Sequence, residues 1–185
     1  MTYFFGGTFD PPHAGHRAIV SHLLAASPKA KVIVMPAPMA PLRGAEKAFT
    51  YRQRFHLLRV MFADAIVSGL VTLSVLERRL PPPHYTINTL EALGKYCDEK
   101  PVLVIGGDQA EKLPRWHRYT DIALAYRFVI FSRQGSAISN LPNLRYEQIT
   151  DFSCDESSTA VRDQLMALGP EARFAAALAI AEAVR

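Results

Sequence analysis

Short apolar runs alternate with segments of helical periodicity along this chain, and this alternation limits its fold more than any other feature. A strand followed by a helix and then another strand is the unit of a parallel sheet, because parallel strands need a long crossover between them. The pattern therefore predicts an α/β, Rossmann-like, doubly wound fold with a mostly parallel sheet and flanking helices. An alanine-rich end adds a small C-terminal helical part.

The predicted strands cover residues 2–5, 31–35, 71–75, 102–105, 128–131 and 145–149. The predicted helices cover residues 17–26, a segment capped by Thr50, a segment from Thr86 or Asn88 to Tyr96, and residues 109–113, 119–125, 157–168 and 171–185. In the segment after Thr50, the side chains Phe55, Leu58, Phe62 and Ile66 form one apolar face. Loops are expected at residues 36–49 and 134–143. With no long linker and no repeat, we expect one domain over residues 1–185.

Composition excludes some partners. The net charge of +4 admits an anionic ligand, but the basic residues are scattered, so we expect no nucleic acid as a partner. Cys97 and Cys154 lack metal-ligand spacing and are expected to be thiols in a reducing compartment. With neither a leader nor a membrane-length apolar run, we expect a cytoplasmic protein that has no membrane partner. A homo-oligomer is compatible with the sequence.

The run GGTFDPPHAGH at residues 6–16 directly follows the first predicted strand and marks a candidate ligand site. We expect the strand to end in a glycine turn and a helix to begin near His16. The N–H groups at a helix start attract anions, and glycines let a ligand approach closely. His13 and His16 could therefore donate hydrogen bonds to a polyphosphate. The alternative is a proline-rich turn with surface histidines.

This run resembles the His-x-Gly-His motif of the nucleotidylyltransferase superfamily, and its longer form is similar to bacterial nicotinate-nucleotide adenylyltransferases. The resemblance covers essentially the whole chain. It implies transfer of the adenylyl group of ATP to nicotinic acid mononucleotide, with release of pyrophosphate, in NAD biosynthesis. The implied catalytic residues are His13, His16, Thr8 and Arg162, and the implied ATP contacts in this run are Gly6, Gly7, Thr8, Phe9 and His16.

The resemblance also implies Mg²⁺, held mainly by the ATP phosphates and without a protein ligand. A zinc site is a poor alternative, because the two histidines have no nearby carboxylate or cysteine ligands.

A second block, ESSTAVR at residues 156–162, resembles the superfamily's Ile-Ser-Ser-Thr-x-Ile-Arg, with Glu156 and Val161 in place of isoleucine. Hydroxyls and N–H groups at a helix start suit phosphate groups. Arg162 lies one turn after Ser158 on the same helical face, where it can add its charge. The resemblance assigns ATP binding to Ser158, Thr159 and Arg162. An ordinary helix cap with a solvated arginine is the alternative.

A third block, Gly106-Gly107-Asp108, follows the predicted strand 102–105. A carboxylate there can accept hydrogen bonds from ribose hydroxyls, and the resemblance places Gly106 and Asp108 beside adenosine. For Asp108 the alternative is a helix N-cap, and both roles could hold together. The opening run, the loop after Pro36 and this block all follow strands, so they are expected along one edge of the sheet, where open α/β sheets bind ligands.

Two segments resemble the family's acceptor site. HYTINTL at residues 84–90 is similar to Ser-Tyr-Thr-x-x-Thr-Leu, and LPRW at residues 113–116 is similar to Leu-x-x-Trp. An aromatic platform beside a helix start suits a flat ring that bears a carboxylate. The resemblance assigns the acceptor to Tyr85, Thr86 and Trp116, with Arg43 supplying charge where the family carries His-Lys. Core packing is the alternative for Trp116, and a helix cap for Tyr85 and Thr86.

Two other functions remain open from the residues alone. The same transfer could use nicotinamide mononucleotide or phosphopantetheine, or the chain could be a non-catalytic nucleotide-binding sensor. A flat acceptor pocket argues against phosphopantetheine, and the combination of His13, His16, Ser158 and Arg162 argues against a sensor. The remaining histidines are expected to be ordinary packed or surface side chains. They are His22, His56 and His117.

Overall fold

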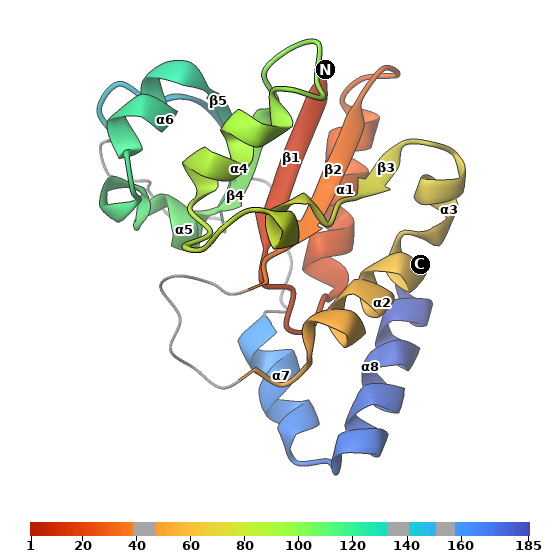
Figure 1. Cartoon of the computed structure of the whole chain (residues 1–185). Coiled ribbons are helices and arrows are strands. Elements are labelled where there is room, and N and C mark those ends of the chain that lie inside the picture. Colours follow the sequence, from red (N-terminus) through yellow and green to blue (C-terminus); the bar gives the residue numbers. More distant parts are fainter. Residues whose placement is uncertain (39–46, 133–140, 151–157) are drawn as a thin grey trace.

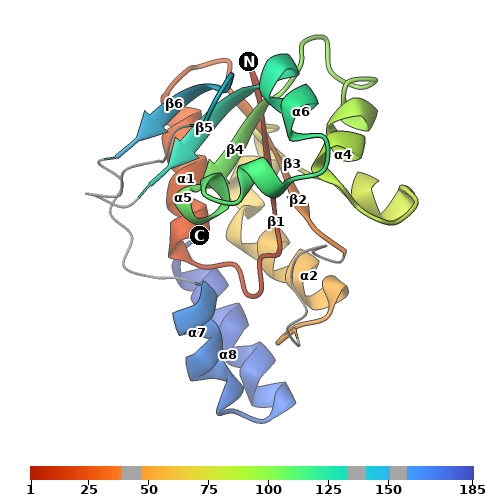
Figure 2. The same cartoon turned by 90° about the vertical axis from the view of Figure 1, so that its left-hand side faces the viewer.

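The chain forms one parallel sheet with helices on both faces (Figures 1 and 2), as seen in a computed structural model that describes residues 1–38, 47–132, 141–150 and 158–185. Its strands are β1 (Thr2–Gly7), β2 (Lys31–Pro36), β3 (Val71–Leu73), β4 (Val102–Gly106), β5 (Arg127–Phe131) and β6 (Arg145–Ile149). Their order is β3-β2-β1-β4-β5-β6, and all these pairings are parallel. The sheet grows outward from β1 in both directions, which confirms the Rossmann-like prediction.

The helices divide between the two faces of this sheet, as Figure 1 shows. One face is covered by α1 (Ala14–Ala25), α2 (Tyr51–Met61), α3 (Ala63–Val67), α7 (Ser158–Met166) and α8 (Pro170–Ala183). The other is covered by α4 (Thr86–Leu93), α5 (Gly107–Ala110), α6 (Tyr119–Ala125) and the 3₁₀ turn η2 (Leu113–Arg115). A second 3₁₀ turn, η1 (Leu76–Arg79), leads from β3 toward α4.

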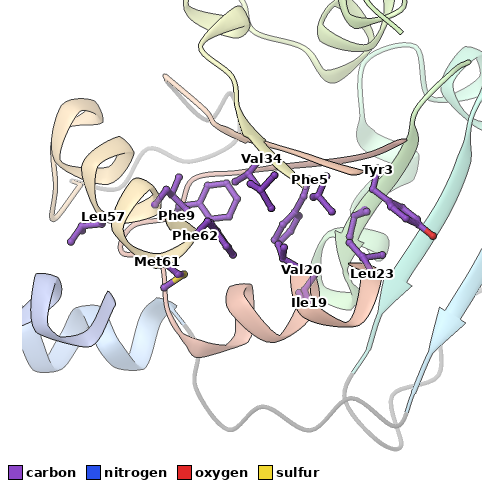
Figure 3. Packing of buried hydrophobic residues seen from close by; sticks show 14 of the residues in the cluster. Tyr3, Phe5, Phe9, Ile19, Val20, Leu23, Val34, Leu57, Met61 and Phe62 are labelled. Atoms are coloured by element: carbon purple, nitrogen blue, oxygen red, sulfur yellow. The ribbon is translucent and has the colours of Figure 1, made fainter. Parts of the chain in front are cut away.

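Alternating side chains of the central strands build a core on each face. Tyr3 and Phe5 of β1 pack with α1, α2 and the C-terminal helices, a cluster seen from close by in Figure 3. Phe4, between them, packs on the opposite face with α4 and α6. Both faces of β1 are therefore dry, which is why its sequence is continuously apolar rather than alternating.

Several predicted boundaries were wrong. The segment that begins after Thr50 is two helices, because the backbone leaves the helical region at Phe62 (φ −108°, ψ 18°). The strand predicted at 71–75 ends at Leu73. The helix from Thr86 ends at Leu93, after which the bond from the Tyr96 N–H to the Leu93 carbonyl tightens the chain into a turn. The helix predicted at 109–113 is split into α5 and η2.

The predicted C-terminal helical part is present. Helices α7 and α8 form a hairpin beside α2 (Figure 1). Ala177 and Ala181 of α8 are buried, and their small side chains let the helix lie close to its neighbours. Within the described ranges, no helix combines the length and the apolar character needed to cross a membrane. Cys97 is a half-buried thiol, and Cys154 lies outside the described residues.

Candidate active site

The turn after β1 differs from the predicted glycine turn. Gly6 and Gly7 belong to β1 and pair with Met35 and Pro36 of β2. A Cβ on Gly7 would lie 3.3 Å from the ring of Phe9 and would crowd it, and the backbone of Gly7 is not left-handed. The left-handed residue is Phe9 itself, with φ of 50°. The chain therefore turns two residues later than expected.

Phe9 holds this unfavourable backbone through its buried ring. Only 2% of the residue is exposed, and its ring packs edge-on against Phe5 at 5.3 Å and His16 at 4.8 Å between centroids. A left-handed non-glycine residue costs on the order of 1–3 kcal/mol. Burial of an aromatic ring among other rings offsets a cost of this size. Phe9 was expected to contact ATP, but its side chain is part of the core beneath the turn.

His13 and His16 lie together at the start of α1, as expected. His13 is the N-cap, and its Nδ1 accepts a hydrogen bond from the Gly15 N–H at 3.1 Å. The His16 Nδ1 accepts from the His13 N–H at 3.1 Å, and the two rings are 3.9 Å apart between centroids. The histidines thus form a capping box in which imidazoles replace the usual hydroxyl and carboxamide.

These hydrogen bonds to the backbone determine the tautomer of both imidazole rings. A backbone N–H can only donate, so each Nδ1 accepts and the neutral ring bears its hydrogen on Nε2. Burial lowers the pKa of His16 well below its ordinary value of 6.5, and the nearby His13 lowers it further. His16 is therefore a neutral hydrogen-bond donor at neutral pH, on a helix N-terminus that favours anions.

Asp10 ties this turn to the start of α2. Its carboxylate is buried, and its two oxygens accept hydrogen bonds from the N–H groups of Ala48 and Phe49, both at 3.0 Å. Thr50, the next residue, caps α2 as predicted, with Gln53 as its capping-box partner. Asp10 therefore fixes the chain where residues 47–50 enter α2.

The second predicted block meets the first. Helix α7 begins at Ser158, as expected, and Arg162 reaches back to the turn after β1. The Arg162 Nη1 donates to the Asp10 carbonyl at 3.3 Å, and Nη2 donates to the Thr159 Oγ1 at 3.3 Å. Segments about 150 residues apart in the sequence thus share one site, and the guanidinium of Arg162 lies beside the His13–His16 turn.

Two cations at this site were missed by the sequence reasoning. Arg54 of α2 is fully buried, and its guanidinium donates to the carbonyls of Thr8 and Ala37, the latter at 3.0 Å. Lys47 donates to the Pro38 carbonyl at 2.7 Å. Burial and the nearby Arg54 lower the pKa of Lys47, which Asp10 partly opposes. The sequence around Arg54 did not predict its burial, because an arginine near a helix start is usually solvated.

The third block lies at the end of β4, on the same edge of the sheet as β1. Gly106 is the N-cap of α5, so Asp108 is not the cap and that alternative was wrong. The Asp108 carboxylate is exposed in the first turn, where it accepts from Gln109 at 2.7 Å. A Cβ on Gly106 would lie 2.8 Å from the Asp108 Oδ1, so a larger residue at position 106 would displace that carboxylate.

The two predicted acceptor segments are neighbours. Tyr85, the N-cap of α4, stacks on His117 with centroids 4.2 Å apart and ring planes 22° apart. Trp116, adjacent to His117, is half-buried and packs on the core beneath α4, so core packing accounts for part of its role. Thr86 is the first residue of α4. His22 and His56 are ordinary packed or surface side chains, whereas His117 belongs to this aromatic pair.

A buried acid supports the acceptor segment from below. Glu77 of η1 accepts a hydrogen bond from the Thr89 Oγ1 at 2.8 Å, and both residues are buried. Burial raises the pKa of Glu77, while the bond from Thr89 and the nearby His84 lower it. This bond connects η1 to α4 and so helps to set the position of Tyr85 and Thr86.

Some of the expected residues lie in parts of the chain that the structure does not describe. Arg43 lies outside the described residues, as do Glu156 and Ser157. Among the residues that the structure describes, no three histidine, cysteine or acidic side chains gather closely enough to hold a metal ion. The described side chains around the His13–His16 turn are instead nitrogen donors and cations, together with the hydrogen-bonded Asp10.

The chain is similar to known proteins over most of its length. Residues 4–164 match the family model described as cytidylyltransferase-like. A probable nicotinate-nucleotide adenylyltransferase of Nitratiruptor sp. is 31% identical over 98% of this chain and 95% of its own. Another, of Bacillus pumilus, is 30% identical over 88% of this chain and 84% of its own.

The fold has solved counterparts as well. A Plasmodium falciparum nicotinic acid mononucleotide adenylyltransferase, solved in complex with NaAD, superimposes with a TM-score of 0.72 at 17% identity. The superposition covers 89% of this chain and 83% of that one. The family-model match over residues 4–164 and the identity to the two adenylyltransferase relatives show that the chain belongs to the cytidylyltransferase-like family, among the nicotinate-nucleotide adenylyltransferases.

Proposed function

We propose that this enzyme transfers the adenylyl group of ATP to nicotinic acid mononucleotide, forming nicotinic acid adenine dinucleotide and pyrophosphate in NAD biosynthesis. The observation that carries the proposal is the link between the His13–His16 cap and Arg162 through the Asp10 carbonyl. It gathers phosphate-binding groups from both ends of the chain at one helix N-terminus. Because the reaction consumes ATP, we propose a cytoplasmic location.

The chemistry needs positioning rather than a covalent intermediate. A phosphate oxygen of the mononucleotide attacks the α-phosphorus of ATP, the bond to the bridging oxygen breaks, and pyrophosphate leaves with the electron pair. Negative charge grows on the departing oxygens. The Nε2–H groups of His13 and His16, the guanidinium of Arg162 and the Thr159 hydroxyl stabilise this charge. Ser158 remains a proposed phosphate contact on sequence grounds. A neutral His16 keeps its hydrogen for donation throughout.

The two nucleotides lie along the carboxyl edge of the sheet. We assign adenosine to Gly106 and Asp108 after β4, and the pyridine ring to the Tyr85, Thr86 and Trp116 segments. This assignment is supported by the contact between Tyr85 and His117, which brings both aromatic segments together. The N–H groups at the start of α4 suit the carboxylate of a nicotinate ring. Arg43 remains a proposed acceptor contact on sequence grounds.

Magnesium fits this site as an ion carried by the nucleotide. The described carboxylate nearest the histidine pair in sequence, Asp10, is buried and already accepts two backbone N–H bonds. An ion held through phosphate oxygens and water therefore suits these residues better than a protein cage. When bound, Mg²⁺ would neutralise phosphate charge.

Isotope labelling tests the proposed reaction. With ATP labelled at the α-phosphorus, the label should appear in the dinucleotide, and with label at the γ-phosphorus it should appear in pyrophosphate. His16→Ala should lower kcat by about 100-fold, since one lost donor to developing charge costs about 3 kcal/mol. Transfer of the γ-label to the acceptor, or near-normal turnover of His16→Ala, would contradict the proposal.

A further inference from the structure

Arg54 occupies an unusual position for a charged residue, since it is fully buried beneath the proposed ATP site. Its two terminal nitrogens donate to carbonyls at the ends of neighbouring strands. One is the Thr8 carbonyl just after β1, and the other is the Ala37 carbonyl just after β2, at 3.0 Å. The Ala37 N–H in turn donates to the Gly7 carbonyl at 2.8 Å. The guanidinium thus joins two strand ends at the point where both leave the sheet.

The backbone of Arg54 is itself held firmly. Its N–H bonds to the Thr50 carbonyl at 3.0 Å, directly after the capping box of Thr50 and Gln53. The residues that precede this cap are bound by Asp10, whose carboxylate accepts from the Ala48 and Phe49 N–H groups. The turn therefore holds the start of α2 through Asp10, and α2 holds the turn through Arg54.

Arg54 binds a peptide bond that adjoins a strained residue. Its acceptor, the Thr8 carbonyl, belongs to the peptide bond that leads into Phe9, whose φ is 50°. A backbone in this region persists only where its surroundings specify it. Displacement of this peptide would shift Asp10 and, four residues after Phe9, the cap His13.

We propose that Arg54 is a positioning residue for adenylyl transfer, whose guanidinium fork holds the Thr8–Phe9 peptide in register with the end of β2. This role of Arg54 rests on the adenylyl transfer proposed above. Arg54 acts through the turn, which carries the histidines that meet the phosphates. A fork is needed because two carbonyls on different strands must be reached at once, and a single ammonium cannot reproduce that geometry.

Arg54 stays charged despite its burial, because an arginine guanidinium does not lose its proton in proteins. Burial lowers the pKa of the guanidinium, while Asp10 and the Tyr51 side chain raise it. The guanidinium carbon lies 5.5 Å from the centroid of the Tyr51 ring, a cation–π arrangement. Arg54 is thus a cation whose role beneath the site is to hold two backbone carbonyls in place.

Arg54→Lys is the decisive variant, because it keeps the charge and loses the fork. We expect kcat to fall about 10- to 100-fold, as for a small misplacement of catalytic groups. The KM values for ATP and the mononucleotide should stay within about threefold, because the groups that bind them are retained. The matched control is Arg59→Lys on the exposed side of the same helix, where the guanidinium contacts only His56 among the bonds described, at 3.2 Å. Its kcat should equal that of the wild type.

A purely structural role would give a different result. The Arg54→Lys protein would then melt at a lower temperature yet turn over normally, per folded molecule, well below its melting temperature. A kcat within twofold of the wild type under those conditions would overturn the proposal. Guanidinium at low millimolar concentration should partly restore kcat to Arg54→Ala and leave the wild type unchanged.

A measurement on the wild type keeps the proposal testable if the variants do not fold. The backbone order parameter of the Phe9 amide, measured by NMR relaxation without substrates, should be about 0.85, as in rigid strands. A value below about 0.6 would show that Arg54 does not hold the turn. This measurement is independent of turnover. An inactive wild type with a rigid Phe9 would therefore reject the proposed function and leave the role of Arg54 in the turn intact.

Discussion

Replacement of Asp10 by alanine should cost a large part of the stability of this enzyme. The Asp10 carboxylate is 3% exposed and accepts two backbone N–H bonds at 3.0 Å, from Ala48 and Phe49. Hydrogen bonds to a charged group contribute about 1.5–3 kcal/mol each, and buried donors left without a partner retain their desolvation cost. Loss of both bonds should therefore lower the free energy of unfolding by about 3–6 kcal/mol. Domains have only about 5–15 kcal/mol in total.

Urea unfolding, followed by circular dichroism at neutral pH, measures this loss. Asp10→Asn should lose roughly half as much, because the amide keeps one oxygen that can accept an N–H. Asp121→Ala is the matched control, since Asp121 is exposed and pairs with Arg118 on the surface at 2.6 Å. Its midpoint should stay close to that of the wild type. A loss below about 1 kcal/mol for Asp10→Ala would refute the assignment of Asp10 as the anchor of residues 47–50.

Three further variants test other parts of the site. His16 has a pKa lowered below 6.5, so the unfolded chain binds a proton that the folded chain does not, and stability falls as the pH drops below that value. His16→Asn should remove this contribution, at most about 1.4 kcal/mol per pH unit, in urea unfolding at pH 7.5, 6.0 and 5.0. Glu77 has a pKa raised above 4.5, so its ionisation costs stability as the pH rises through the window above that value. Glu77→Gln should therefore gain stability relative to the wild type as the pH rises above 4.5, and a stability difference that does not change with pH in urea unfolding would contradict this. Trp116→Ala should raise the KM for the mononucleotide about tenfold, the effect of a lost aromatic contact, with little change for ATP. Steady-state kinetics with equal effects on both substrates would remove Trp116 from the acceptor site.

Local sequence patterns were sufficient to predict the order of strands and main helices along the chain. Apolar runs of β1, β4 and β5 are buried on both faces, so they were visible as continuous hydrophobic segments. The break between α2 and α3 was not visible, because Phe62 keeps the helical spacing of the apolar face while its backbone leaves the helix. Periodicity reports which side chains are buried, and it does not report the backbone angle of one residue.

The candidate site also has parts that the sequence predicts and parts that it does not. The histidine cap and the start of α7 are local features of a helix N-terminus, and they could be recognised from adjacent residues. Arg54 and Asp10 could not, because their partners are carbonyls and N–H groups 17 to 46 residues away in the sequence. Backbone groups are the same at every residue, so their contacts leave no mark in the sequence.

Pyrophosphate release tests the proposed reaction and the proposed acceptor together. The enzyme should be given ATP and Mg²⁺ with nicotinic acid mononucleotide, its amide or phosphopantetheine, and kcat/KM compared. We expect pyrophosphate release with a clear preference for the acid, and loss of most of that activity in His16→Ala. Activity with phosphopantetheine alone would contradict the assigned acceptor segments, and ATP binding without pyrophosphate release from any acceptor would contradict the enzymatic function itself.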